Sequence, residues 1–163
     1  MKFTWIRNPS FSWIHRQVPK IRNYPSCQLV TAINALIFLG GKNIVDCNNF
    51  EKYIDMAVCR HGSAFKEAME DVYSQLNLFI HECSYPLKRY SSKWISKHLP
   101  LETTIWTLKT GFHSVLVYAI KNDYLWITNM FHGYRADVKI HRKALPVSLA
   151  RCFHCVKYFR IKE

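Results

Sequence analysis

The feature that most constrains the fold is a change of residue pattern at Pro100. Before this proline, apolar residues recur every three or four positions, for example in stretch 63–76, which is the spacing of one helix face. After it, stretches rich in aromatic and β-branched residues are separated by short turn sequences, which is the pattern of strands. A chain with helices first and an antiparallel sheet afterwards is typical of the α+β class.

The individual elements follow from the same patterns. Strands are predicted over 103–108, 112–120, 124–129, 138–141 and 156–161, and helices over 27–39, 49–58, 63–76 and 91–98, with a short connecting strand over 78–82. The first helix has the clearest ends, because Pro25 precedes it, Ser26 can cap it, and Gly40 and Gly41 stop it. Asn122 and Asp123 are expected to form a tight hairpin turn.

The length of 163 residues and the lack of a long linker predict one domain over 1–163. Within it we expect an N-terminal arm over 1–24, which two prolines keep from being helical. A mainly helical lobe over 25–100 and a β-sheet lobe over 101–163 follow.

Composition narrows the classes of protein that fit. The 49% hydrophobic and 15% aromatic content excludes a disordered chain. We expect no membrane span, because no stretch of about 18 uncharged apolar residues occurs, and no secretion signal. A cytoplasmic location with six reduced cysteines follows as an expectation, in a protein of bacterial, phage or viral origin. The net charge of +12 predicts attraction to acidic partners such as nucleic acid, anionic lipid or acidic protein.

Three residues stand in an order that indicates nucleophilic catalysis. Cys27 opens the first helix, His113 opens the strand over 112–120, and Asn129 closes the next strand. A helix N-terminus favours a thiolate, a nearby imidazole stabilises it further, and an amide can fix the imidazole tautomer. From residues alone, the alternatives are a small buried cysteine and a structural histidine.

Two sequence blocks resemble the papain-like cysteine peptidase superfamily. Block 18–32, VPKIRNYPSCQLVTA, resembles the nucleophile region of its bacteriocin-processing (double-glycine leader) peptidase-like branch, and block 111–129 looks like that branch's histidine strand, turn and Asp/Asn strand. The resemblance spans about residues 18–129. It implies a papain-like fold, in which an N-terminal helical lobe packs its nucleophile helix on a C-terminal antiparallel sheet. It also implies a thiol hydrolase that acts on a peptide or protein substrate and needs no cofactor or metal.

The resemblance implies a role for each matching residue. Cys27 would be the nucleophile, His113 the base and acid, and Asn129 the residue that orients His113. The branch often has aspartate at this third position. Its oxyanion-hole glutamine usually lies several residues before the cysteine; here the matching place is Asn23, and Gln17 is the alternative donor.

Two further hypotheses come from other features. Cys152 and Cys155 form a C-x-x-C pair, which is half of a zinc site, although an ordinary reduced pair is favoured. Basic clusters interleave with tyrosines, as at Lys88, Arg89 and Tyr90, which suits single-stranded nucleic acid. The alternative function is therefore an inactive papain-like domain that binds nucleic acid or an acidic protein through its basic surface.

Overall fold

The computed structural model describes residues 5, 26–40, 70, 74, 78–107, 111–128, 137–145 and 150–155. Its helices are α2 (Ser26–Gly40) and α5 (Ser92–Lys97), with 3₁₀ turns η2 (Leu87–Arg89) and η3 (Arg142–Ala144). Its strands are β1 (Leu78–Glu82), β2 (Leu101–Thr107), β3 (Gly111–Lys121), β4 (Tyr124–Thr128), β5 (Asp137–His141) and β6 (Ala150–Cys155). Within these residues no helix has the length and apolar character that crossing a membrane requires.

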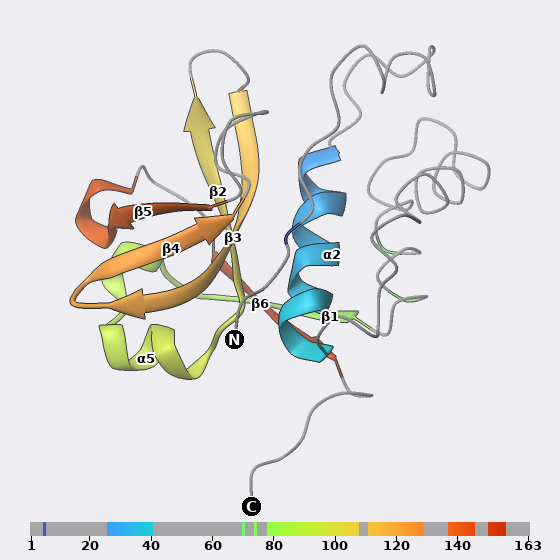
Figure 1. Ribbon diagram of the computed structural model, residues 1–163, viewed down its shortest axis with the longest axis horizontal. Helices are drawn as coiled ribbons and strands as arrows, with labels where there is room; N and C mark the ends of the chain where they lie inside the picture. The colour runs from blue at the N-terminus through green and yellow to red at the C-terminus, as the bar shows by residue number, and fades with distance from the viewer. Residues whose placement is uncertain are drawn as a thin grey trace, which may run out of the picture.

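The strands form one sheet in the order β1-β6-β2-β3-β4-β5, and every neighbouring pair is antiparallel. Figure 1 shows α2 to one side of β3, and α5 below the β3–β4 hairpin. The predicted α+β class is confirmed, and so is the packing of the first helix on the sheet, through its contacts with β3.

The two faces of the sheet differ in chemistry. One face carries an apolar core against η2 and α5, made of Leu87, Ile95, Leu101, Val115, Val117, Leu125, Ile127, Leu145, Ala150 and Cys152. The other face turns toward α2 and contains buried polar residues, namely Glu102, Ser114 and Thr128. Because side chains alternate along a strand, neighbouring residues of β2, β3 and β4 belong to these two different surroundings.

Helix α2 is a core helix rather than a surface helix. Every residue from Val30 to Ile37 is buried, which a helix with a solvated face does not allow. Its two buried polar residues are satisfied by the sheet: Thr31 Oγ1 donates to the Ser114 carbonyl at 3.2 Å, and Asn34 Nδ2 donates to Thr128 Oγ1 at 3.0 Å. These bonds fix both the rotation and the height of α2 on the sheet.

The predicted hairpin turn is confirmed. Asn122 and Asp123 have φ of 50° and 62°, the left-handed conformation that a two-residue type I′ hairpin requires. The Asp123 carboxylate accepts from the Ser92 hydroxyl and, at 2.9 Å, from Arg142 Nε. The turn therefore anchors α5 and η3 at the end of the sheet.

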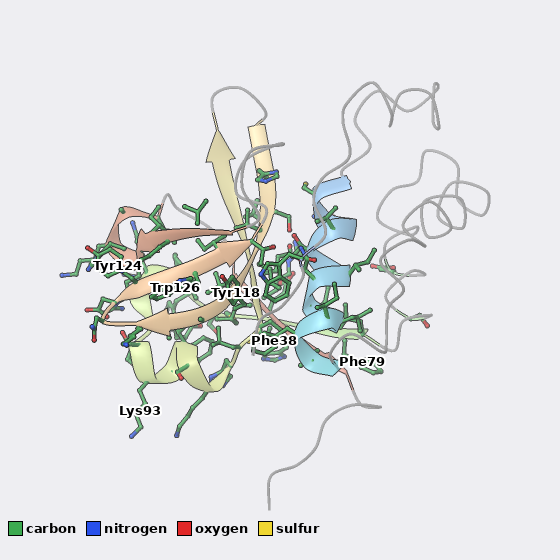
Figure 2. All side chains as sticks on the ribbon, in the orientation of Figure 1. Phe38, Phe79, Lys93, Tyr118, Tyr124 and Trp126 are labelled. Carbon is green, nitrogen blue, oxygen red and sulfur yellow. The ribbon has the colours of Figure 1, made fainter. Side chains whose placement is uncertain are left out.

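Most described elements lie where the sequence predicted them. The exceptions are β6, η2 and η3, which were not predicted, and the predicted last strand, 156–161, lies outside the described residues. Of the predicted helices, 49–58 also lies outside, and from 63–76 the structure describes Glu70 and Ser74, both helical. The arm over 1–24 is represented by Trp5, which is buried and packs on Tyr118 at 4.8 Å between ring centroids. Figure 2 shows Tyr118 between β3 and α2.

Candidate functional site

The candidate site is centred on Cys27, in the first turn of α2. Cys27 and Thr31 are one helical turn apart and so lie on one face of the helix. This face meets β3 at Ser114, whose backbone forms a hydrogen bond with the Cys27 thiol. Ser114 Oγ also donates to Thr31 Oγ1 at 3.2 Å. The start of α2 is thereby held against the start of β3.

His113 directly precedes Ser114 on β3. It is buried and pairs with Ile105 of β2. Because side chains alternate along a strand, the side chains of His113 and Ser114 leave β3 on opposite faces. Among the described residues, the pairing of β3 with β4 begins at Leu116, so His113 lies in the part of β3 that is paired with β2.

The other predicted site residues, Asn129, Asn23 and Gln17, lie outside the described residues. The residue before Asn129 is Thr128, the last residue of β4, which is buried and accepts the bond from Asn34 of α2. The end of β4 is thus fixed to the same helix that carries Cys27.

Some of the surroundings of Cys27 raise the pKa of its thiol and others lower it. Burial raises the pKa of the Cys27 thiol, since a thiolate loses its hydration there, and the nearby Glu102 carboxylate raises it further. Hydrogen bonds from the backbone of Ser114, Gln28 and Cys27 itself lower it, but burial prevails. The sequence argument considered the helix terminus and a nearby imidazole, which both lower the pKa of the thiol, and it omitted the desolvation.

Glu102 belongs to the site and was not predicted. Its side chain is fully buried on the α2 face of the sheet, opposite Leu116, and both carboxyl oxygens lack a hydrogen-bond partner among the described residues. The closest ion-pair contact described for it is Arg151 Nη1, at 3.8 Å. The Ser114 hydroxyl lies near, but it donates its single proton to Thr31.

The Glu102 carboxyl favours its neutral form. Burial raises its pKa, and the Arg151 charge and the Ser114 hydroxyl only oppose this effect. The sequence did contain a signal, because an acidic residue between Leu101 and Thr103 stands within the strand. The predicted strand began at Thr103, so Glu102 was left outside it.

Cys152 and Cys155, the pair of the zinc hypothesis, both lie in strand β6. No group of three or more metal-ligating side chains occurs among the described residues.

Comparison with known proteins gave one kind of match. No protein-family model matches the chain, and no curated protein matches it. Among solved structures it is similar to a double glycine motif protease from an AMS/PCAT transporter, crystallised with the leader peptide. The identity is 18%, the match covers 78% of this chain and 82% of that chain, and the TM-score is 0.46.

Proposed function

We propose that this protein is a papain-like cysteine peptidase that cleaves a peptide or amide bond through an acyl-enzyme on Cys27. The observation that carries the proposal is the contact between the Cys27 thiol and the backbone of Ser114, the residue next to His113. Thiol catalysis also needs an imidazole within hydrogen-bond reach of the sulfur, and this contact holds Cys27 close to the backbone of the histidine strand.

The reaction proceeds in two stages. His113 takes the proton of Cys27, and the thiolate attacks the carbonyl carbon of the substrate. The negative charge on the carbonyl oxygen is stabilised by the Cys27 backbone N–H and by the side-chain amide of Asn23, or of Gln17. His113 then gives its proton to the leaving amine, and water hydrolyses the thioester with His113 as base. Asn129 accepts from the other ring nitrogen of His113 and fixes its tautomer.

Burial of Cys27 makes the imidazole necessary. Because desolvation raises the pKa of the thiol, a lone Cys27 would carry very little thiolate at neutral pH. An imidazolium within hydrogen-bond reach of the sulfur offsets that cost. The raised pKa of Glu102 acts in the same direction, since the charged form of this carboxyl opposes the thiolate.

The test is turnover of a peptide library, analysed by mass spectrometry, with the wild type and the Cys27→Ala variant. Cys83→Ala is the matched control, because it removes a thiol outside the proposed site. We expect cleavage to be lost only in Cys27→Ala. Asn23→Ala or Gln17→Ala, whichever removes the oxyanion donor, should reduce the rate about 10²–10³-fold. Equal cleavage by wild type and Cys27→Ala would overturn the proposal.

We propose that the substrate is a peptide or protein. We also propose that the enzyme acts in the cytoplasm, where thiols stay reduced. The similar protease was crystallised with a leader peptide, so peptides with a double-glycine end are the first to include in the library.

A specific observation keeps the alternative function in view. Arg142 Nη1 donates to the carbonyls of Lys88, at 3.4 Å, and of Tyr90, which joins two basic clusters that lie far apart in the sequence. Tyr90 stacks on Trp94 at 3.8 Å between centroids, next to these cations. A surface that combines cations and stacked rings can bind single-stranded nucleic acid.

On β4 and β5, Lys139 Nζ also lies 4.6 Å from the centroid of the Tyr124 ring and 5.2 Å from that of Trp126. Figure 2 shows both rings along β4. The alternative, an inactive papain-like domain that binds nucleic acid or an acidic protein, predicts salt-sensitive binding of a labelled oligonucleotide. That binding would be unchanged in Cys27→Ala.

A further inference from the structure

Two further cysteine thiols, those of Cys83 and Cys152, lie close together and away from Cys27. The Sγ atoms of Cys83 and Cys152 are 3.5 Å apart. Cys152 lies on β6, beside Leu101 of β2, and belongs to the apolar core on the α5 side of the sheet. Cys27 contacts Ser114 on the α2 side, so the sheet separates the two positions.

The backbone holds both cysteines at a fixed spacing. Cys83 follows the last residue of β1, and its N–H donates to the Ala150 carbonyl at 2.9 Å, which continues the β1–β6 ladder. Cys152 pairs with His81 in that ladder. The two thiols are therefore diagonal neighbours on paired strands, a relation in which side chains can meet.

A disulfide needs an S–S distance of about 2.05 Å, so the sulfurs have to approach by roughly 1.5 Å. Rotation about the Cα–Cβ bonds, together with a small shift of the backbone at Cys83 just after the end of β1, would supply a movement of this size. The described residues offer no third ligand that would make the pair a metal site instead.

We propose that Cys83 and Cys152 form a reversible disulfide site whose oxidant is a low-molecular-weight disulfide such as oxidised glutathione. The Cys83 thiolate attacks one sulfur of the oxidant, forms a mixed disulfide and releases the first small thiol. The Cys152 thiolate then attacks the Cys83 sulfur, closes the protein disulfide and releases the second small thiol. One disulfide is reduced, one is formed, and the two protein thiol protons leave with the two products.

The surroundings of the two thiols set this order. Cys83 is half-buried and can meet the oxidant, whereas Cys152 is 1% exposed. A hydrogen bond from Cys152 favours the Cys83 thiolate, although burial still raises the pKa of Cys83. Burial and the neighbouring Cys83 raise the pKa of Cys152 to about 12. Cys83 is thus the attacking thiol and Cys152 the resolving thiol, and both steps accelerate as pH rises.

The bond would close a long loop at the edge of the sheet. The cysteines are 69 positions apart, and Cys83 follows β1, the terminal strand of the sheet order. Closing a loop of this length restricts the unfolded chain, so we expect the disulfide to raise Tm by roughly 5–15 °C.

The experiment treats the full chain with a series of reduced and oxidised glutathione at pH 8, followed by peptide mapping under non-reducing conditions and thermal unfolding. We expect one dominant cross-linked species that joins the Cys83 and Cys152 peptides, with a raised Tm that dithiothreitol reverses. Cys27→Ala should behave as the wild type does in this assay.

Two variants test the order of the steps. Cys152→Ala should accumulate glutathione on Cys83, because the resolving thiol is missing. Cys83→Ala should leave Cys152 unmodified while the protein stays folded. The proposal is overturned if the wild type links either cysteine mainly to another partner, such as Cys155, or if both remain thiols at the most oxidising ratio. Labelling of the buried Cys152 in folded Cys83→Ala would contradict the proposed order.

Discussion

Glu102 gives the sharpest expectation about stability. Its carboxyl is fully buried, its oxygens have no hydrogen-bond partner among the described residues, and burial raises its pKa above the ordinary value of 4.5. A group whose pKa is higher in the folded state stabilises the fold below its unfolded pKa. That contribution is lost as pH rises from about 4.5 through the folded pKa.

The Glu102→Gln variant isolates this effect, because it keeps the shape of the side chain and removes its ionisation. The free energy of unfolding of the wild type should fall relative to Glu102→Gln by up to about 1.4 kcal/mol for each pH unit in that window. Above the folded pKa of Glu102 the difference should become constant. Arg151→Gln should extend the window to higher pH, since it removes a charge that opposes the shift.

The assay is urea unfolding, followed by tryptophan fluorescence, at several pH values between 4.5 and 8.5. Glu82→Gln is the matched control, because Glu82 is exposed at the end of β1 and should track the wild type. The argument fails if wild type and Glu102→Gln show parallel stability profiles across this range. It also fails if the wild type gains stability relative to the variant as pH rises.

Three shorter expectations concern the core and the hairpin. Ile127→Ala should cost about 2–5 kcal/mol in urea unfolding, because Ile127 is fully buried in the α5-side core, and a cost below 1 kcal/mol would contradict that packing. Asn122→Ala should destabilise by about 1 kcal/mol and Asn122→Gly should not, since φ is 50° there; equal stability of the two variants would refute the turn. Asp123→Asn should lower Tm at pH 7, because bonds from Ser92 and the Arg142 charge lower the pKa of the Asp123 carboxyl. The Tm difference should vanish as pH falls through that lowered pKa, below 3.8, and a difference that persists at pH 2 would show another cause.

Local signals in the sequence were enough for much of the fold. Pro25 and Gly40 bracket the apolar run that becomes α2, and Asn122 with Asp123 supplies the two residues that tolerate the left-handed turn. The stretch between Gly111 and the turn at Asn122 is rich in β-branched and aromatic residues, and this composition predicts a strand. These features depend on neighbours in the chain, so they can be predicted without knowing the fold.

What could not be predicted depends on contacts between distant segments. β6 contains Arg151, His154 and two cysteines, which give no strand pattern, and it is a strand because β1 and β2 pair with it on both sides. The burial of Glu102 and the approach of Cys83 to Cys152 follow from that same pairing. The approach of the two cysteines has no local signal, and the position of Glu102 between Leu101 and Thr103 does not by itself show that it is buried.

The candidate site, too, could be predicted only in part. The resemblance of two blocks pointed to Cys27 and His113, and the structure adds that α2 holds Cys27 beside Ser114. The rise in the pKa of Cys27 could not be predicted, because it depends on how deeply the start of α2 is covered by the rest of the fold. The parts assigned to Asn129 and Asn23 remain predictions.

The most direct test of the central claim is the pH dependence of alkylation by iodoacetamide, followed for each cysteine by mass spectrometry, in the wild type and in His113→Ala. A working thiolate–imidazolium pair predicts that Cys27 reacts fastest and does so well below pH 8, and that His113→Ala abolishes this low-pH reactivity. If Cys27 is inert below pH 8, or reacts in the same way with and without His113, the pair does not exist and the peptidase proposal fails.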